Sequence, residues 1–440
     1  MAKRKLAVFA MLLFASAISM GWGLVVTHGA RGIILDYQMA DIGARCLLKR
    51  CDLYSQQEMT RFYLENGGER VSSPSTTEPP HYAASIQVYP PTAELFFAAF
   101  ALLPWKIAYV LWTALIALLM PIAAFLMWDV AHVDAPDLPF YLAWFLLVNS
   151  GGMMAGGNPA GVAVTLCIIA SWCFLHNRFA MLGVLCMASS LAIKPHDSGL
   201  IWLYLLLLGA TCRKRTLQSL SVVALVAVAA IAWVWRASPH WVQELHANLG
   251  VNGSNDPAGH AAIAMVNLQT VVAFFRNDPH FYNLVTCVVC APLILLCLIV
   301  TLRGDRSRKS IWLGMAAITV LSLLPLYHRP YDAKLLLLTL PACALLWAEG
   351  GPTRWLALLF TTAGIIVTSE IPLIFLQIAS IPEGPGFRNR SLALLTTRPA
   401  PLILFAEALF FLWIYVRHNS NHRKALSTPQ PAHMVQPLPS

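Results

Sequence analysis

Charged residues are scarce in this 440-residue chain. They make up 12% of it, against about 25% in a typical soluble domain. Hydrophobic residues make up 58%, and the mean hydropathy is +0.63. Apolar runs such as 6–26 and 355–379 exceed the roughly 18 residues that suffice to span a bilayer. The scarcity of charge therefore argues against a soluble fold and predicts an all-α polytopic membrane protein.

Other expected features are also missing. The chain has no Walker motif and no Rossmann glycine fingerprint, which argues against nucleotide-driven chemistry. It shows no internal repeat, although many transporters are built from repeats. The ten cysteines form no metal-binding pattern, because most lie in apolar runs and act there as small hydrophobic residues. Cys46 and Cys51 share a polar loop, and whether they form a disulfide stays open at this point.

The net charge of +9 comes from basic tracts between apolar runs. Short loops rich in Lys and Arg remain in the cytoplasm, so we interpret the excess as topological and expect no nucleic-acid partner. Both termini carry such residues, which predicts a multi-pass inner (plasma) membrane protein with cytoplasmic termini. The acidic loop 129–137 does not follow this pattern. The basic tracts are 3–5, 212–215, 303–309, and Arg417 with Arg423 and Lys424.

Hydropathy and loop charge together predict about twelve spans. We expect them at 6–26, 105–128, 138–149, 159–175, 179–193, 198–211, 216–235, 283–302, 311–326, 334–348, 355–378 and 401–416. Residues 1–424 would form one membrane domain with outer loops at 27–104 and 236–282, followed by a disordered cytoplasmic tail at 425–440. Several spans are too short to cross about 30 Å alone. They meet at polar breaks (151–159, 194–197 and 327–334), which predicts a wet cavity at the outer face.

Ionisable side chains at membrane depth are costly, so each is a functional candidate. A carboxylate beside cations suits group transfer, because the carboxylate can take a proton from an acceptor hydroxyl while the cations stabilise a phosphate leaving group. Tyr89 adds an aromatic face at the interface. The predicted outer-face set is Asp36, Asp41, Lys194, His196, Asp197, His328, Arg329, Asp332 and Lys334.

Plainer interpretations stay open. Asp36 could simply be the first residue to reach water after the first span, and Lys194 could be a snorkelling residue. His328 and Arg329 could form a structural ion pair with Asp332. A metal site also stays open, because the set includes ligands of the right type, although their spacing singles out none. We therefore expect no metal and no required cofactor, and leave a need for a divalent metal undecided.

Three ordered stretches carry a family resemblance. Residues 36–54 (DYQMADIGARCLLKRCDLY), 88–115 (beginning VYPPTAELFF) and 156–209 (beginning GGNPAG and containing LAIKPHDSGL) resemble the GT-C superfamily of integral membrane glycosyltransferases. Within it they resemble glycosyltransferase family 87, the polyprenol-phosphate-mannose-dependent mannosyltransferases. Many members have a His-rich motif where this chain has YHRPYDAK (327–334), so the resemblance leaves the sugar and the acceptor open.

The resemblance implies a GT-C bundle of about a dozen helices whose outer loops form the active site. The donor would be a polyprenyl-phosphate-linked sugar, mannose or related, held in membrane lipid, and the acceptor a hydroxyl of a glycan or glycolipid. The reaction would invert the anomeric centre, and Asp36 matches the catalytic base. Lys194 is the first candidate to bind the donor phosphate, followed by His328 and Arg329. Supporting or acceptor roles would fall to Asp41, His196, Asp197, Asp332, Lys334 and Tyr89.

Two other functions would explain intramembrane charge. One is a transporter or a lipid or glycolipid flippase, against which the missing repeats and the long polar loop after the first span argue. The other is a non-catalytic membrane scaffold that has kept the fold. Loss of sugar transfer on substitution of Asp36 would separate an enzyme from both.

Overall fold

The computed structural model describes residues 2–29, 36–67, 86–253, 262, 264–379 and 390–427. These residues form helices and no strand, and several of the helices are long and apolar, so the predicted all-α polytopic class is confirmed. Among the described residues, five helices are long and apolar enough to cross a membrane. They are α1 (Ala2–Gly29), α5 (Trp105–Ala131), α11 (Ala210–Ala237), α14 (Pro279–Arg303) and α20 (Pro399–Ser427).

Five more predicted spans coincide with single shorter helices. These are α6 (Leu138–Val148), α8 (Pro159–Leu175), α9 (Ala180–Ile193), α10 (Pro195–Leu207) and α15 (Arg308–Ser322). Hydropathy locates these elements because α6, α8 and α9 are apolar throughout, and α10 and α15 are apolar after a polar first turn. Their length leaves them dependent on neighbours, since a lone helix of this size does not cover the hydrocarbon thickness.

Two predicted spans need correction. The span at 334–348 begins as the 3-10 helix η3 (Asp332–Thr339) and continues as α16 (Leu340–Glu349), where Pro341 lacks the N–H that a continuous ladder needs. The span at 355–378 is split into α17 (Gly351–Val367) and α18 (Glu370–Ala379). Between them, the hydroxyls of Thr368 and Ser369 donate back to carbonyls four residues earlier, a bonding pattern that bends helices.

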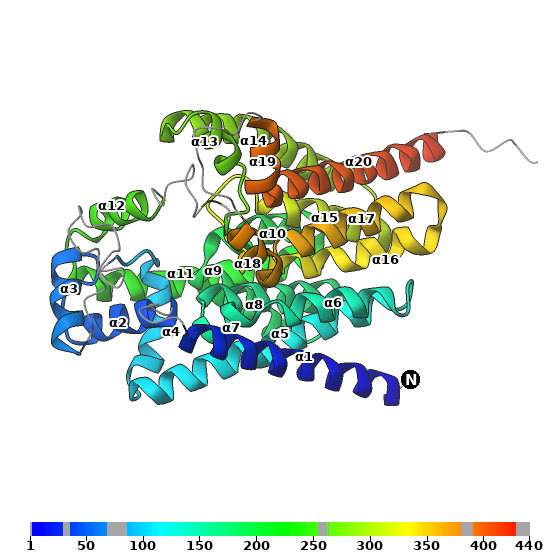
Figure 1. Ribbon diagram of the computed structural model, residues 1–440. Helices are drawn as coiled ribbons and strands as arrows, with labels where there is room; N and C mark the ends of the chain where they lie inside the picture. The colour runs from blue at the N-terminus through cyan, green and yellow to red at the C-terminus, as the bar shows by residue number, and fades with distance from the viewer. Residues whose placement is uncertain are drawn as a thin grey trace, which may run out of the picture.

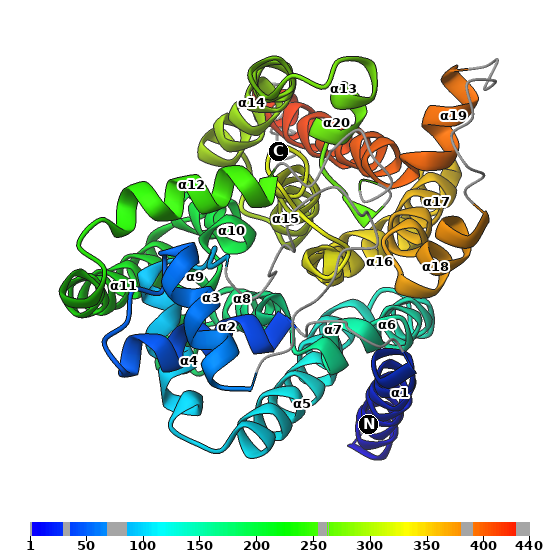
Figure 2. The ribbon, with the colours of Figure 1, turned by 60° about the vertical axis from the view of Figure 1, so that its left-hand side comes forward.

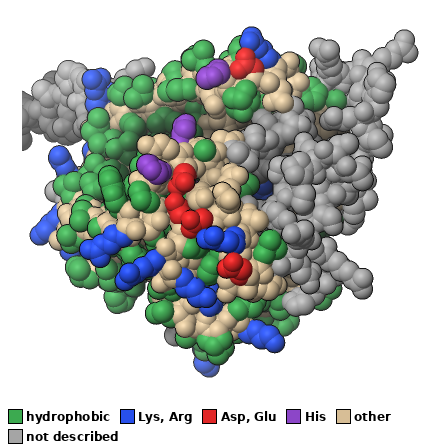
Figure 3. Space-filling model, turned by 90° about the vertical axis from the view of Figure 1, so that its left-hand side faces the viewer, with side chains coloured by type: hydrophobic (Ala, Val, Ile, Leu, Met, Phe, Trp, Pro, Cys, Tyr) green, Lys and Arg blue, Asp and Glu red, His purple; other side chains and the backbone are tan. Residues whose placement is uncertain are grey.

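The described parts of the two predicted outer loops are largely helical. The first contains α2 (Asp36–Leu48), α3 (Gln56–Glu65) and α4 (Pro91–Ala101), and the second contains α12 (Trp241–Gly253) and α13 (Gln269–Phe275). Helices α2, α3 and α12 gather at one end of the bundle, whereas the start of α1 and the end of α20 lie at the other (Figure 1). Histidine, acidic and basic side chains appear on the face at the α2–α3–α12 end (Figure 3).

Helices α8 and α15 occupy the middle of the bundle (Figure 2). Nearly every residue of both is buried, which explains why α8, and α15 after its basic first turn, are apolar on all sides. Of the predicted tail at 425–440, the first three residues belong to α20, which ends at Ser427. The rest of the predicted tail, residues 428–440, lies outside the described residues.

The acidic loop at 129–137 lies against the basic tracts. Its three carboxylates form ion pairs with the N-terminal tract and with the start of α15: Asp129 with Lys5 (2.5 Å), Asp137 with Arg4 (3.0 Å) and Asp134 with Arg308 (2.7 Å). Such exposed pairs contribute only about 0–1 kcal/mol each. They nevertheless place the acidic loop at the same end as the basic tracts 3–5 and 303–309. The assignment of that end to the cytoplasm stays a prediction.

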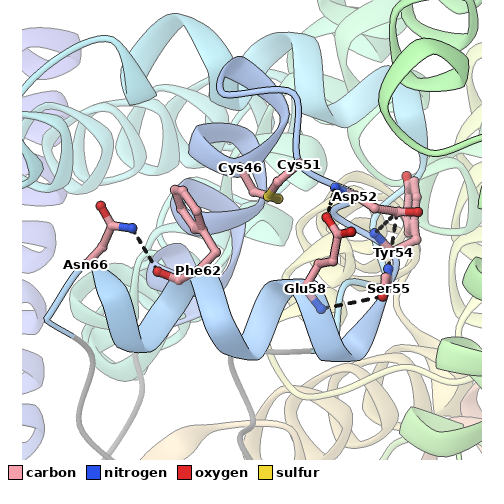
Figure 4. The surroundings of a disulfide bond; sticks show 8 residues. All are labelled: Cys46, Cys51, Asp52, Tyr54, Ser55, Glu58, Phe62 and Asn66. Atoms are coloured by element: carbon pink, nitrogen blue, oxygen red, sulfur yellow. Dashed lines mark hydrogen bonds between the residues drawn. A yellow bond between two sulfur atoms is a disulfide. The ribbon is translucent and has the colours of Figure 1, made fainter.

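A disulfide closes the corner between α2 and α3 (Figure 4). It joins Cys46 to Cys51, the pair that the sequence left open, and their Cα atoms lie 5.0 Å apart. Beyond it, Asp52 accepts a hydrogen bond from the Ser55 N–H, and Glu58 accepts one from the Asp52 N–H. The Ser55 side chain then caps α3. The corner is therefore rigid, and it holds the far end of the helix that begins with Asp36.

Candidate active site

The polar breaks are short, well-defined turns. At the second break, α9 ends at Ile193 and α10 begins at Pro195, with Lys194 in a non-helical conformation between them (φ −142°, ψ 83°). This confirms the local prediction, because a proline disfavours helix at the residue before it. At the first break, α7 (Gly151–Gly156) ends at Gly157, which adopts the left-handed conformation (φ 64°).

Asp36 is the first residue of α2 and is partly exposed. Its Oδ2 accepts a hydrogen bond of 2.8 Å from the side-chain amide of Asn158. Asn158 also caps α8, because its Oδ1 accepts the Ala160 N–H at 2.8 Å. This cap fixes the orientation of the amide and aims its Nδ2 at Asp36. The carboxylate is thus held from one side, and its other oxygen, Oδ1, makes no hydrogen bond among the described residues.

The turn before Asn158 leaves no room for a side chain. A Cβ on Gly157 would lie 2.7 Å from the Cβ of Tyr37, and its positive φ disfavours other residues as well. The Trp112 indole donates a hydrogen bond of 2.9 Å to the Gly157 carbonyl, and the rings of Tyr37 and Trp112 stack with centroids 5.2 Å apart. The aromatic packing therefore fixes the backbone that presents Asn158 to Asp36.

The electrostatic surroundings of Asp36 connect it to the other two breaks. Burial raises the pKa of Asp36 above its usual value, while the Asn158 hydrogen bond and the positive charges of Arg329 and Lys194 act in the opposite direction without cancelling the rise. Lys194 and Arg329 therefore lie within electrostatic reach of the carboxylate. Tyr89 lies in the same neighbourhood, since it interacts with the charges of both Asp36 and Lys194.

Lys194 is buried and held by two carboxylates. Its Nζ lies 2.5 Å from Asp332 Oδ1 and 3.6 Å from Asp197 Oδ2, and 5.3 Å above the Tyr331 ring. The second oxygen of Asp332 accepts the Arg329 backbone N–H at 2.7 Å. These pairs compensate the cost of burying an ammonium group. They also mean that a phosphate near Lys194 would share its charge with two carboxylates.

Arg329 is the more available cation. Its side chain is partly exposed, and its Nε donates to the Tyr327 hydroxyl at 2.5 Å. Within the described part of the chain, its two terminal guanidinium nitrogens donate to no acceptor. A guanidinium with free terminal nitrogens suits bidentate binding of a phosphate.

The two histidines surround Asp197. His196 Nε2 lies 3.5 Å and His328 Nε2 lies 3.4 Å from the same oxygen, Asp197 Oδ1. Asp197 and His328 are fully buried, and His196 is partly exposed. The structure thus brings together Asp36, Tyr89, Lys194, His196, Asp197, His328, Arg329 and Asp332 of the predicted set.

Two predicted supporting residues lie elsewhere. Asp41 pairs with Arg45 of the same helix at 2.6 Å. Lys334 donates to the Asn149 carbonyl at 2.9 Å and interacts with the charge of Glu370. Lys334 therefore ties η3 to the turn before α7, and neither residue contacts the carboxylate of Asp36.

Sequence reasoning missed three residues of the cluster. Asn158 was noted only as part of GGNPAG, although an Asn directly before a proline that opens an apolar run is itself a helix-cap signal. Tyr327 and Tyr331 flank the charged residues of YHRPYDAK, and nothing in the local sequence marks a tyrosine there as part of a site. Both rings contact a cation of the cluster, Arg329 and Lys194 respectively.

Comparison with known proteins gives a family. The model of glycosyltransferase family 87 matches residues 88–327, which is more than half of the chain and covers the first break, with Asn158, and the second break, with Lys194. The match ends at the start of the third break, so His328, Arg329 and Asp332 lie after it. Asp36 lies before the matched part. No curated protein and no solved structure matches the chain. The protein therefore belongs to glycosyltransferase family 87 and is a membrane glycosyltransferase.

Proposed function

We propose that this enzyme moves a sugar, mannose or a related hexose, from a polyprenyl-phosphate donor to a hydroxyl of a glycan or glycolipid at the extracytoplasmic face. The observation that carries the proposal is the surroundings of Asp36. A partly exposed carboxylate, oriented by the Asn158 amide, lies within electrostatic reach of Arg329 and Lys194. A base next to cations is the arrangement that transfer from a phosphate-linked donor requires.

Asp36 acts as the general base in this proposal. Its Oδ2 is occupied by Asn158, so Oδ1 accepts the proton of the acceptor hydroxyl. The hydroxyl oxygen attacks C1 of the sugar from the face opposite the phosphate, a new C–O bond forms, and the bond from C1 to the phosphate oxygen breaks. The anomeric centre is inverted, and polyprenyl phosphate leaves with the electron pair of that bond.

Arg329 and Lys194 stabilise the leaving phosphate. Arg329 contacts it directly, because its terminal nitrogens are free of other acceptors in the described structure. Lys194 contributes mainly through its positive charge, because Asp332 and Asp197 already hold its ammonium group. This order differs from the one that sequence resemblance favours, where Lys194 comes first. A GT-C-type bundle with cytoplasmic termini would place this site at the outer membrane face, where polyprenyl phosphates are available.

The donor class and the base can be tested together. Membranes containing the wild-type enzyme should transfer sugar from a defined polyprenyl-phosphate hexose and not from the matching nucleotide sugar. Asp36→Asn should abolish most of this transfer, while Glu65→Gln, which neutralises an exposed carboxylate at the end of α3, should retain it. Transfer from the nucleotide sugar, or full activity of Asp36→Asn at normal expression, would contradict the proposal.

A further inference from the structure

Three potential ligand atoms converge beside the proposed transfer site. One ligand atom each from His196, Asp197 and His328 lies within 4.8 Å of the other two. Asp197 Oδ1 is 3.5 Å from His196 Nε2 and 3.4 Å from His328 Nε2. Two of these residues are fully buried, and neither Asp197 Oδ1 nor His328 Nε2 makes a hydrogen bond in the described structure. Buried polar atoms without partners are expensive.

The backbone fixes the form of His328. Its Nδ1 lies 3.0 Å from the Leu326 carbonyl oxygen, which can only accept, so Nδ1 carries a hydrogen. The neutral ring then presents a lone pair at Nε2 towards Asp197. A histidine that donates one ring nitrogen to a backbone carbonyl and offers the other as a ligand is the usual arrangement at metal sites.

A proton alone fits this arrangement poorly. One proton on His328 would join Nε2 to Asp197 Oδ1 and leave His196 outside the bond. Protons on both rings would put two imidazolium groups next to each other, with centroids 5.1 Å apart. A divalent cation bonds all three atoms at once. Tetrahedral bonds of about 2.0–2.1 Å place neighbouring ligand atoms about 3.4 Å apart, close to the 3.5 and 3.4 Å that separate Asp197 Oδ1 from the two histidine nitrogens.

We propose that His196, Asp197 and His328 bind a divalent transition-metal ion of the zinc class, through His196 Nε2, Asp197 Oδ1 and His328 Nε2. Asp332 is not a ligand, because its oxygens are occupied by Lys194 and by the Arg329 N–H. Three protein ligands leave one position open, as in catalytic zinc sites. The ion joins the start of α10 to the segment that carries Arg329.

The open position has a fitting occupant. A phosphate oxygen of the lipid-linked donor could fill it, and the ion would then share the leaving-group charge with Arg329. This last step rests on the proposed function, whereas metal binding by the three residues does not.

Metal binding can be measured on the purified full-length protein in detergent. The protein is stripped with a chelator, loaded with Zn²⁺ alone, desalted and analysed for bound zinc. Wild type should retain one equivalent. His328→Ala and Asp197→Asn should each weaken Zn²⁺ binding by more than about 100-fold. Loss of a residue that only hydrogen-bonds to a metal ligand weakens binding by at most about that factor. His280→Ala, an exposed histidine of α14, is the matched control and should bind like wild type.

A second variant keeps the test decisive if those proteins fold poorly. His196→Cys places a thiolate at the partly exposed ligand, so the Co²⁺-loaded protein should gain a sulfur-to-cobalt charge-transfer band that wild type lacks. Absence of retained Zn²⁺ in wild type, unchanged binding in His328→Ala and Asp197→Asn, or absence of the new band would overturn the proposal. Asp36→Asn should still bind Zn²⁺, so failure of the transfer mechanism remains distinguishable from failure of the metal site.

Discussion

Replacing Asn158 with Asp tests how the base is held. The new side chain can still cap α8, because its Oδ1 can accept the Ala160 N–H as Asn158 does. The atom that donates to Asp36, at 2.8 Å, becomes an oxygen. The lost hydrogen bond to a charged group is worth about 1.5–3 kcal/mol. Two carboxylates at that distance would also repel by about 6 kcal/mol at an effective dielectric constant near 20.

The sign of the effect follows from protonation. Burial already raises the pKa of Asp36, so the wild-type rate should fall with decreasing pH at a higher pH than for an ordinary aspartate. In Asn158→Asp the carboxylate pair retains a proton, which raises the pKa of Asp36 further and occupies the base. The lost hydrogen bond alone predicts a drop of about ten- to a hundredfold in kcat/KM near neutral pH, with recovery as the pH rises.

The assay is kcat/KM for transfer from a polyprenyl-phosphate sugar, measured across pH for wild type and variant. Asn283→Asp, at an exposed position of α14, introduces the same charge change as a control. Thermal unfolding of Asn283→Asp should match that of wild type. Asn158→Asp should still unfold cooperatively because the helix cap is kept, at a lower midpoint because the hydrogen bond to Asp36 is lost. A wild-type pH profile in Asn158→Asp would refute the view that Asn158 holds the base.

Three further predictions concern the frame around the site. Removing the disulfide by the double substitution Cys46→Ser and Cys51→Ser should lower the free energy of unfolding by about 2 kcal/mol, as expected for so short a loop. Thermal unfolding without reductant measures this loss, and an unchanged midpoint would mean that the disulfide does not stabilise the protein. Glu94→Gln should leave thermal stability equal or higher, because this fully buried carboxylate of α4 has an oxygen without a partner, and a large loss of stability would show that its charge is needed. Single cysteines can be introduced into a protein variant that lacks the native free cysteines and labelled in intact cells. Ser75→Cys should react with a membrane-impermeant thiol reagent and Lys214→Cys should not. The reverse pattern would show that the topology is opposite to the predicted one.

Local features of the fold were predictable from the sequence. Apolar runs located the spans, and Pro195 marked the end of α9 because a proline constrains the residue before it. The splitting of α17 from α18 was missed, because Thr368 and Ser369 do not lower the hydropathy enough to mark a break. Hydropathy reports burial in lipid and says little about side chains that bond back to the helix.

The pairings within the site could not be predicted. Asn158 meets Asp36 across 122 residues and Lys194 meets Asp332 across 138, and no local pattern encodes such contacts. Helix geometry explains why one predicted residue lies apart from Asp36. Asp41 lies five residues after Asp36 in α2, which places it about 140° around the helix, on the side that faces Arg45.

Helix geometry also separates Lys334 from Asp332. It lies two residues after Asp332 in a 3-10 helix, where three residues complete a turn, so the two side chains point to different sides. Asp332 faces Lys194, while Lys334 faces the Asn149 carbonyl. Two charged residues that are close in sequence can be assigned to the same site only when the type of helix that carries them is known.

The most direct test of the central claim separates donor binding from turnover in Asp36→Asn. With purified protein and a polyprenyl-phosphate hexose, the Kd of the donor and the single-turnover rate of transfer are measured for wild type and variant. If Asp36 is the general base, the variant should bind the donor with a similar Kd and transfer the sugar about 10²- to 10⁴-fold more slowly. A variant that transfers at the wild-type rate, or one whose only defect is weaker donor binding, would contradict the account.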